Sequence, residues 1–269
     1  TGSSFSVNNG IDLEGEGGLT WFKYRDESWA HALFDSERGI TKGIESHSSS
    51  AEYTVSGTAL SSYNSDGFSV GSDANGYVQT NNKNSVSWSF KRQEGFFDIV
   101  TWTGTGSYRT LDHNLGCIPG FIMLKKTSGS ASWICWHRYM GSGSNAHYLN
   151  LNENYAMGTD GGGGSNPNAS VNSVSSTQFT VGADNNGSGG TWVAYLFAGG
   201  ESDAATARSV KSDGTDDYLK ATSNTNNVIG TNDFTIELWV YPTNPGTSHS
   251  NFIFDFRGSE NTESRIASN

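Results

Sequence analysis

The stretch that decides the fold is Phe68-Ser-Val-Gly-Ser-Asp-Ala-Asn-Gly76, which is followed after a short gap by Ser85-Val-Ser-Trp-Ser-Phe90. The same pattern returns as Phe179-Thr-Val-Gly-Ala-Asp-Asn-Asn-Gly187 and then Trp192-Val-Ala-Tyr-Leu-Phe197. In both copies an alternating segment ends in Val-Gly, a polar loop follows, and an aromatic segment closes the unit. Period-two alternation is typical of strands with one buried face. The pattern therefore predicts a repeated β unit.

Offsets between matching residues support a tandem duplication. The offset is 102 for Lys23 and Lys125 (125 − 23), 111 for Phe68 and Phe179 (179 − 68), and 107 for Val86 and Val193 (193 − 86). Within each matching segment the offset is constant. It changes only from one segment to the next, which is the result that insertions and deletions in loops produce. Self-similarity of this kind identifies the structural unit before any fold is assigned. We expect an all-β protein with two antiparallel β-sandwich modules, residues 1–103 and 104–199, and a linker at 200–208.

The composition fits folded modules with many turns. Hydrophobic residues make up only 34% of the 269, which is low for one compact core, but 12% are aromatic, and disordered chains lack such large apolar groups. The 34 glycines, with abundant Ser, Thr and Asn, supply the turns that many short strands need. The length is sufficient for two domains.

Charge and cysteine usage narrow the function. The net charge is −11 and the 16 basic residues are scattered, which argues against a nucleic-acid partner. No apolar run approaches the roughly 18 residues of a membrane span, so no membrane insertion is expected, and no signal-peptide pattern is visible.

Cys117 and Cys135 are the two cysteines. They favour two partly buried thiols over a disulfide framework, and a single bridge between them stays open.

The C-terminal residues resemble the opening of laminin-G-like, concanavalin A-like jelly-roll domains. The matching blocks are Ser212–Leu219 (Ser-Asp-Gly-Thr-Asp-Asp-Tyr-Leu) and Phe234–Pro242 (Phe-Thr-Ile-Glu-Leu-Trp-Val-Tyr-Pro), with Phe252–Arg257 as the next strand. This resemblance covers residues 209–269, less than a whole domain of that family. It implies the N-terminal part of a jelly roll after the two modules.

Residues 11–198 also resemble a repeat of uncharacterised function from structural proteins of marine bacteriophages, notably those of cyanobacteria. The blocks that carry this resemblance are Gly10–Gly18, Leu33–Gly39, Asn64–Phe68, Phe96–Thr101, His113–Gly116, Trp136–Arg138, Tyr148–Leu151 and Thr191–Ala198. What the resemblance implies is a virion component, such as a tail fibre or a surface appendage. It implies no catalytic chemistry.

Carboxylates and aromatic rings are the candidate binding groups. Asp213, Asp216 and Asp217 could supply oxygen ligands for Ca²⁺, although a tight turn in which these side chains bond to their own backbone is the alternative. No other cofactor is expected. Exposed aromatic rings can stack on the apolar face of a sugar, and the candidates for such stacking are Trp29, Trp133, Trp136 and Tyr139, with Trp102 as a further one. Alternation implies that most of these rings fill the cores instead.

The polar loops of the two copies share Asp and Asn positions. Asp73 and Asn75 return as Asp184 and Asn186, while the loop changes length. We interpret the loop as a turn that the module needs in order to fold, and only secondarily as a binding surface.

No catalytic motif stands in the structural context that it needs. The chain contains no His-Glu-x-x-His helix, and its one Gly-x-Ser-x-Gly match, Gly67–Gly71, falls in the predicted strand that begins at Phe68 and not at the strand-to-helix turn of a nucleophile elbow. Neighbouring acids such as Asp26 and Glu27 do not face each other across a sugar, as a glycosidase pair must. The sequence predicts a protein that is not an enzyme.

Three functions remain for the sequence as a whole. The leading hypothesis is a non-enzymatic phage virion protein, a tail fibre or capsid-surface appendage. Its partners would be other virion proteins and a host-surface glycan, and its location the extracellular particle. We also expect homo-oligomerisation, as a trimer if the protein is a fibre. The alternatives are a secreted bacterial carbohydrate-binding or adhesion protein, and an enzyme whose active site lies in sequence outside this chain.

Overall fold

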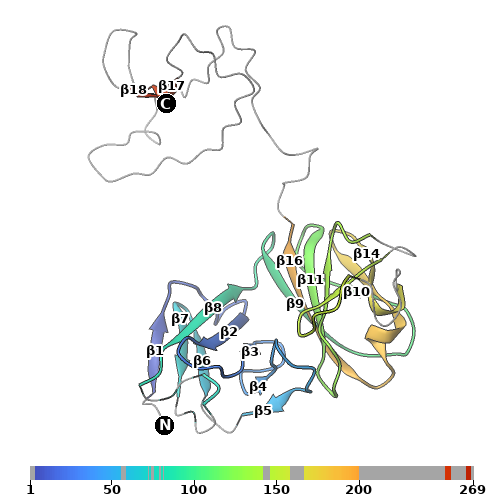
Figure 1. The fold of residues 1–269 in the computed structure, drawn as a ribbon, viewed down its shortest axis with the longest axis horizontal. Coiled ribbons are helices and arrows are strands. Elements are labelled where there is room, and N and C mark those ends of the chain that lie inside the picture. Colours follow the sequence, from blue (N-terminus) through green and yellow to red (C-terminus); the bar gives the residue numbers. More distant parts are fainter. Residues whose placement is uncertain are drawn as a thin grey trace. The chain divides into compact units, whose positions relative to one another are not determined.

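The computed structural model describes residues 4–55, 59–71, 73, 76–78, 80, 82–141, 146–157, 167–199, 252–255 and 265–267. The chain divides into two compact units, Thr1–Arg208 and Ser209–Asn269. Within the described residues every sheet is antiparallel, and helical structure is limited to short 3-10 turns (Figure 1). The predicted all-β, antiparallel fold is confirmed, and the sheets are consistent with the β-sandwich class.

The first repeat is built from two three-stranded sheets and a short ribbon. One sheet has the order β1 (Phe5–Asn8), β7 (Gly67–Val70), β6 (Leu60–Asn64), and the other β3 (Ala32–Asp35), β2 (Gly18–Tyr24), β8 (Ser85–Lys91). The ribbon pairs β4 (Lys42–Gly43) with β5 (Tyr53–Thr54). Alternation directs Phe22, Phe34 and Phe68 into the space between the two sheets, where all three are buried. The rings of Phe22 and Phe68 meet edge to face at 5.4 Å.

The second repeat has the same two layers. A three-stranded sheet has the order β10 (Arg109–Asp112), β15 (Gln178–Val181), β14 (Val171–Val174). It covers a five-stranded sheet with the order β13 (Leu149–Asn150), β12 (Ile134–His137), β11 (Pro119–Lys126), β16 (Thr191–Ala198), β9 (Phe97–Thr103). Two 3-10 turns, η2 (Pro167–Ala169) and η3 (Ala183–Asn186), lie in the connections. The core between these sheets includes Trp136, Phe179 and Trp192.

Strand pairing in the two repeats corresponds residue by residue. Lys23 of β2 lies opposite Val86 of β8, and Lys125 of β11 lies opposite Val193 of β16. These are the residues that the sequence offsets matched. The equivalent strands β6 and β14 each carry a register shift directly after their first residue. A duplicated unit explains why two segments of different sequence have the same irregularity.

Strand β9 lies elsewhere than the sequence suggested. The predicted first module ended at residue 103, but β9 pairs along its full length with β16, from Phe97 opposite Phe197 to Thr103 opposite Thr191. The reason is that β9 is apolar on both faces. Ile99 points into one core and Trp102 into another, so the strand needs a sheet that is covered on both sides.

The two repeats pack face to face through their β2 and β11 sheets. Leu19 and Leu33 of the first repeat share a buried cluster with Met123 and Tyr195 of the second. The four sheets therefore stack as successive layers with three cores between them. Since the middle core joins the repeats, each repeat supports the other.

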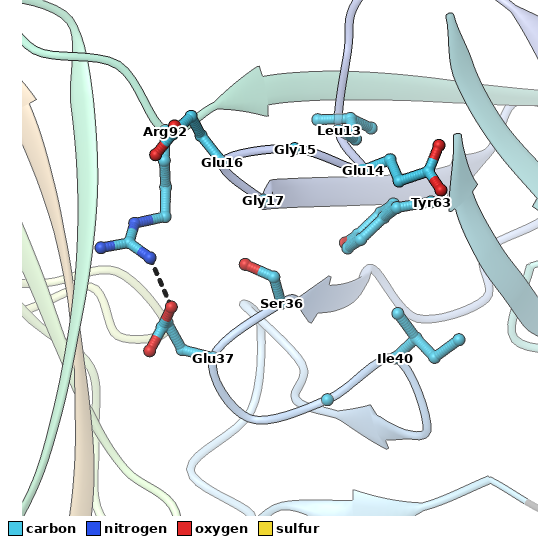
Figure 2. Close-up of a pocket in the computed structure, with 11 residues that line it drawn as sticks. Leu13, Glu14, Gly15, Glu16, Gly17, Ser36, Glu37, Ile40, Tyr63 and Arg92 are labelled. Atoms are coloured by element: carbon cyan, nitrogen blue, oxygen red, sulfur yellow. Dashed lines mark hydrogen bonds and ion pairs between the residues drawn. The ribbon is translucent and has the colours of Figure 1, made fainter. Parts of the chain in front are cut away.

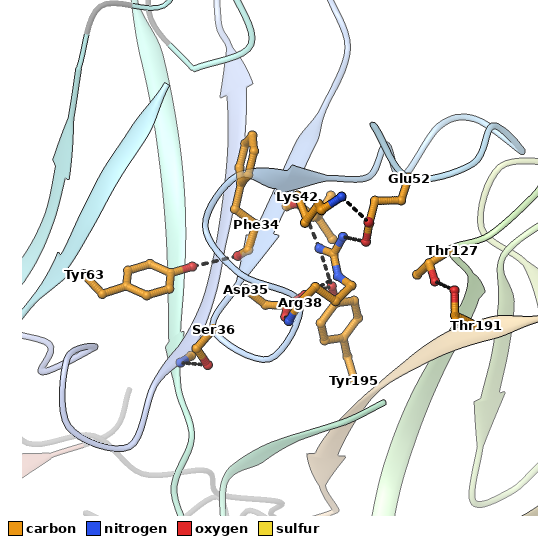
Figure 3. Close-up of polar contacts among 12 residues, drawn as sticks. Phe34, Asp35, Ser36, Arg38, Lys42, Glu52, Tyr63, Thr127, Thr191 and Tyr195 are labelled. Carbon is orange, nitrogen blue, oxygen red and sulfur yellow. Dashed lines mark hydrogen bonds and ion pairs between the residues drawn. The ribbon is translucent and has the colours of Figure 1, made fainter. Parts of the chain in front are cut away.

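A buried ionic network crosses this interface, and we call it the interface network (Figure 3). The Arg38 Nε lies 2.6 Å from Asp35 Oδ2, and the Tyr195 hydroxyl donates a 2.6 Å hydrogen bond to the same oxygen. Arg38 also reaches Glu52 Oε2 at 3.0 Å. Asp35 and Tyr195 are fully buried, and breaking a buried ion pair by removing one partner is strongly destabilising. The network therefore fixes how the two repeats meet.

The connection between β4 and β5 is fastened to the second repeat. The buried Lys125 Nζ donates to the backbone oxygens of Ser49 and Ala131, at 3.0 and 2.6 Å. Burial lowers the pKa of Lys125 to about 8. The Trp133 indole N–H donates to the Glu45 carbonyl at 2.8 Å. This Ser-rich connection is therefore part of the interface between the repeats.

The second unit contributes one described hairpin. It pairs β17 (Phe252–Asp255) with β18 (Arg265–Ala267) in antiparallel fashion. The strand predicted at Phe252–Arg257 begins at the same residue. The predicted strand at Phe234–Pro242 and the rest of the expected jelly roll lie outside the described residues.

Candidate functional site

Two of the predicted sugar-stacking residues are core residues, so that prediction was wrong for them. Trp133 is 0% exposed and Trp136 is 2% exposed. They lie on opposite faces of one strand region: Trp133 points into the core between the repeats, and Trp136 into the core of the second repeat. The Trp136 indole N–H is also satisfied internally, by the Gly141 carbonyl at 3.1 Å. Trp102 is buried too, stacked on Trp192.

The other two predicted residues are exposed but stand apart. Trp29 is 41% exposed and packs edge to face against Tyr24, at 4.9 Å between ring centroids. Tyr139 is 73% exposed, in the turn after β12, with its ring 5.3 Å from that of His137. Within the described part of the chain, no ring contact joins Trp29 to Tyr139.

The predicted metal ligands Asp213, Asp216 and Asp217 lie outside the described residues. Among the residues that the structure does describe, no group of three or more His, Cys, Asp or Glu side chains could hold a metal ion. Cys117 and Cys135 are free thiols, so the bridge left open by the sequence does not form. Burial raises the pKa of Cys135 to about 12, which keeps that thiol protonated and unreactive.

Two of the repeated Asp and Asn positions have structural hydrogen bonds: Asp73 bonds within its own loop, as the sequence interpretation expected, and Asn186 bonds to Trp102 and to the segment that follows β9. The Asp73 carboxylate accepts hydrogen bonds from the backbone of Gly76 and Val78, at 2.9 and 2.6 Å. In the second repeat the buried Asn186 accepts from the Trp102 indole N–H at 3.1 Å. Its amide also donates to Thr105 and to the Ser107 carbonyl, at 2.7 Å each. Asn75 lies outside the described residues.

A surface hollow of about 430 Å³ lies beside the β2 strand (Figure 2). It is lined mainly by Leu13–Gly17, Ser36, Glu37, Ile40, Tyr63 and Arg92. The Arg92 guanidinium binds Glu37 and, at 2.9 Å, Asp98. The hollow is therefore acidic, and its arginine is engaged in ion pairs with the protein itself.

The strongest candidate for a binding surface is an aromatic patch formed by Trp21, Trp88 and His31. Trp21 of β2 lies directly opposite Trp88 of β8, and their rings meet at 6.2 Å with an interplanar angle of 71°. The Trp21 indole N–H donates to His31 Nδ1 at 2.9 Å. Trp88 is 46% exposed. The Trp88 indole is thus held in place by the ring of Trp21 while it exposes apolar surface to solvent.

The hydrogen bond fixes the protonation state of His31. Because Nδ1 accepts from Trp21, the ring carries its proton on Nε2 and is neutral. Burial lowers the pKa of His31, and the nearby positive charge of Lys23 lowers it further. Lys23 itself is tied to the carbonyls of Tyr24 and Glu27, at 2.8 Å each. The patch is therefore an uncharged aromatic surface with a lysine beside it.

Sequence reasoning missed this patch, although the repeat contains a signal for it. The register places Met123 and Tyr195 at the positions of Trp21 and Trp88 in the second repeat. Both of those residues are buried, at 3% and 0% exposure. Large indoles at positions where the other copy has interface residues indicate a face that is only partly covered.

Such a patch can bind a flat, partly apolar ligand. Tryptophan combines a large apolar face with an N–H donor, which suits it to surfaces that are partly wet. A pyranose ring presents one face of C–H groups and an edge of hydroxyls, and it fits that combination. The fixed geometry keeps down the conformational entropy lost on binding.

Comparison with known proteins gives a family match. The family model described as a domain of unknown function, DUF7483, matches residues 1–217. No curated protein and no solved structure matches the chain. In the described residues, no helix is long and apolar enough to cross a membrane. The match covers both repeats and most of the chain, and the chain belongs to the DUF7483 family.

Proposed function

We propose that this chain is a non-enzymatic structural protein of a bacteriophage virion, a tail fibre or capsid-surface appendage that attaches to glycans on the host surface. The virion assignment is supported by the sequence resemblance over residues 11–198, which falls within the matched family region. Its partners are other virion proteins and the host glycan. Calcium, if it contributes, binds at Asp213, Asp216 and Asp217.

The observation that carries the binding role is the aromatic patch. Trp88 combines 46% exposure with support from Trp21, whose own orientation is fixed by the hydrogen bond to His31. Exposed rings that are held in place are the usual anchors of recognition surfaces. The patch therefore supports sugar stacking better than the isolated rings of Trp29 and Tyr139.

The stack of sheets supports a presenting role. The core shared by the repeats and the hydrogen bonds of Tyr195 to Asp35 and Arg38 hold both modules as one body. A rigid carrier keeps a small binding patch in a fixed orientation, which a particle with many copies could use to bind many weak sites together.

A glycan array tests the binding role with two matched variants. Trp88→Ala removes the exposed indole of the patch, and Trp29→Ala removes an exposed indole outside it. We expect Trp88→Ala to weaken binding about tenfold or more, because it removes the ring on which the sugar stacks. A tenfold loss corresponds to ~1.4 kcal/mol of binding free energy. Trp29→Ala should retain binding. Equal binding by wild type and Trp88→Ala would overturn the glycan role of the patch.

Two further measurements test the rest of the proposal. Mass spectrometry of purified phage particles should detect this protein, whereas detection only in secreted bacterial fractions would favour the adhesion-protein alternative. Incubation with the bound polysaccharide should leave its chain length unchanged. Depolymerisation would show that the whole protein is an enzyme.

A further inference from the structure

Strand β8 has an open edge in the part of the chain that the structure describes. Its sheet has the order β3-β2-β8, so β8 pairs with β2 on one side only. The strand is seven residues long, Ser85–Lys91, and contains neither proline nor a bulge. Such an edge is a ready template for another strand.

The second repeat shows what this edge accepts. Its equivalent strand, β16, is covered on the corresponding side by β9 over seven residue pairs. Backbone hydrogen bonds bracket that ladder at both ends, from Ala198 N to Phe96 O at 2.9 Å and from Gly104 N to Gly190 O at 2.7 Å. An edge that takes a seven-residue antiparallel strand in the second repeat has no partner strand in the first repeat among the residues that the structure describes.

The backbone groups that face outward on β8 follow from its pairing with β2. Arg92 N donates to Gly17 O, and Arg25 N donates to Asn84 O. In an antiparallel pair such bonds alternate along the strand. The even-numbered residues of β8 therefore bond to β2, while the N–H and C=O groups of the odd-numbered residues, Ser85 to Lys91, point away from it.

We propose that this edge pairs with β8 of a second copy, forming a two-fold dimer. Trp88 is the midpoint of Ser85–Lys91, so a two-fold axis at Trp88 pairs every residue of both strands. Ser87 then lies opposite Ser89 of the other copy, and Ser85 opposite its Lys91. Outward-facing groups meet outward-facing groups at each of these pairs, so the edge is complementary to itself, as an isologous interface requires.

The dimer would enlarge the aromatic patch. Side chains of directly opposite residues lie on the same face of a sheet, so Trp88 of one copy would adjoin Trp88 of the other, with a Trp21 on each flank. Four indoles would then cross a continuous six-stranded sheet. The role of this row in glycan binding rests on the proposed function, whereas the strand pairing does not.

Cysteine cross-linking tests the register directly. In a Cys117→Ser background, Trp88→Cys places two thiols at a non-hydrogen-bonded pair whose Cα atoms lie about 4.5 Å apart, within the range of a disulfide. Val86→Cys is the matched control, because its opposite residue is Phe90 and the two introduced thiols lie roughly 13 Å apart along the strands, at about 3.3 Å per residue. On mild oxidation, the first variant should form disulfide-linked dimers and the second should not.

Sedimentation of the full chain tests the dimer itself. We expect wild type to sediment as a dimer, Ser87→Pro as a folded monomer because it lacks one outward N–H, and Ser87→Ala as a dimer. Circular dichroism checks that Ser87→Pro is folded, and the cross-linking result stands even if it is not. A monomeric wild type together with no cross-link in Trp88→Cys overturns the proposal, as does equal cross-linking of Trp88→Cys and Val86→Cys. Glycan binding by a monomer would leave the proposed function in place while removing the dimer.

Discussion

The hydroxyl of Tyr195 donates a 2.6 Å hydrogen bond to the carboxylate of Asp35, and neither residue is exposed to solvent. The two residues belong to different repeats. Burial raises the pKa of the Tyr195 phenol well above its ordinary value, and the Asp35 charge adds to that rise. Tyr195 therefore remains a donor over the whole physiological range, and Asp35 keeps two partners, Tyr195 and Arg38.

Removing Arg38 should destabilise the protein strongly. Arg38→Met would leave the Asp35 carboxylate buried with Tyr195 as its remaining side-chain partner, and the expected loss is about 3–5 kcal/mol of unfolding free energy. Tyr195→Phe keeps the ion pair and should lose about 1–3 kcal/mol. Urea unfolding measures both. Arg25→Met, at an exposed arginine, is the control, and equal stability of Arg38→Met and Arg25→Met would contradict the role of the network.

The second polar loop should prove structural. Asn186→Ala leaves the buried Trp102 indole N–H without its acceptor, and the expected loss is about 1–3 kcal/mol. Asp184→Ala, in the same loop but exposed, should change stability by less than about 0.5 kcal/mol. Thermal unfolding of the two variants separates these cases. If both variants have the melting temperature of wild type, the loop has another role.

Substitution of a core tryptophan should destabilise the protein more than substitution of a surface tryptophan. Trp136→Ala removes a ring that is 2% exposed and should lose about 3–5 kcal/mol. Trp29→Ala removes a ring that is 41% exposed, so it should lose clearly less. Tryptophan fluorescence during denaturant unfolding gives both values. A Trp136→Ala protein as stable as Trp29→Ala would place Trp136 at the surface after all.

Acid should weaken the aromatic patch through His31. Burial lowers its pKa in the folded protein below the unfolded value of about 6.5. The stability that neutral His31 contributes is therefore present above about pH 6.5 and is lost as the pH falls toward the folded pKa. His31→Gln should show a shallower decline of unfolding free energy between about pH 6.5 and 5. Burial also lowers the pKa of His113, so part of the decline in unfolding free energy should persist in His31→Gln. An identical dependence of unfolding free energy on pH in wild type and His31→Gln would contradict the prediction for His31.

The repeat could be read from the sequence because its evidence is local. Alternation identifies a strand from a few residues, and the equal offset of Lys23 to Lys125 and of neighbouring pairs reveals the duplication. The assignment of β9 could not be read in this way. Its partner, β16, begins at Thr191, and alternation does not say which distant edge a strand joins.

The candidate site shows the same limit. Trp133, directly before β12, and Trp88, in β8, are both tryptophans in β-rich segments, yet Trp133 is fully buried and Trp88 is 46% exposed. The difference depends on where the second repeat covers the β2 sheet. That cover is set by contacts such as the one between Arg38 and Tyr195, which are 157 positions apart. Composition and period contain no information about it.

The position of β16 bears on how the protein is made. Among the described strands of the first unit β16 is the last to leave the ribosome, yet it lies between β11 and β9, inside its sheet. Until β16 has been synthesised, β9 lacks its partner strand, and Asp35 lacks the hydrogen bond from the Tyr195 hydroxyl. Synthesis therefore leaves both repeats incomplete together, and a nascent chain stopped just before Thr191 would expose two unfinished cores to chaperones and proteases.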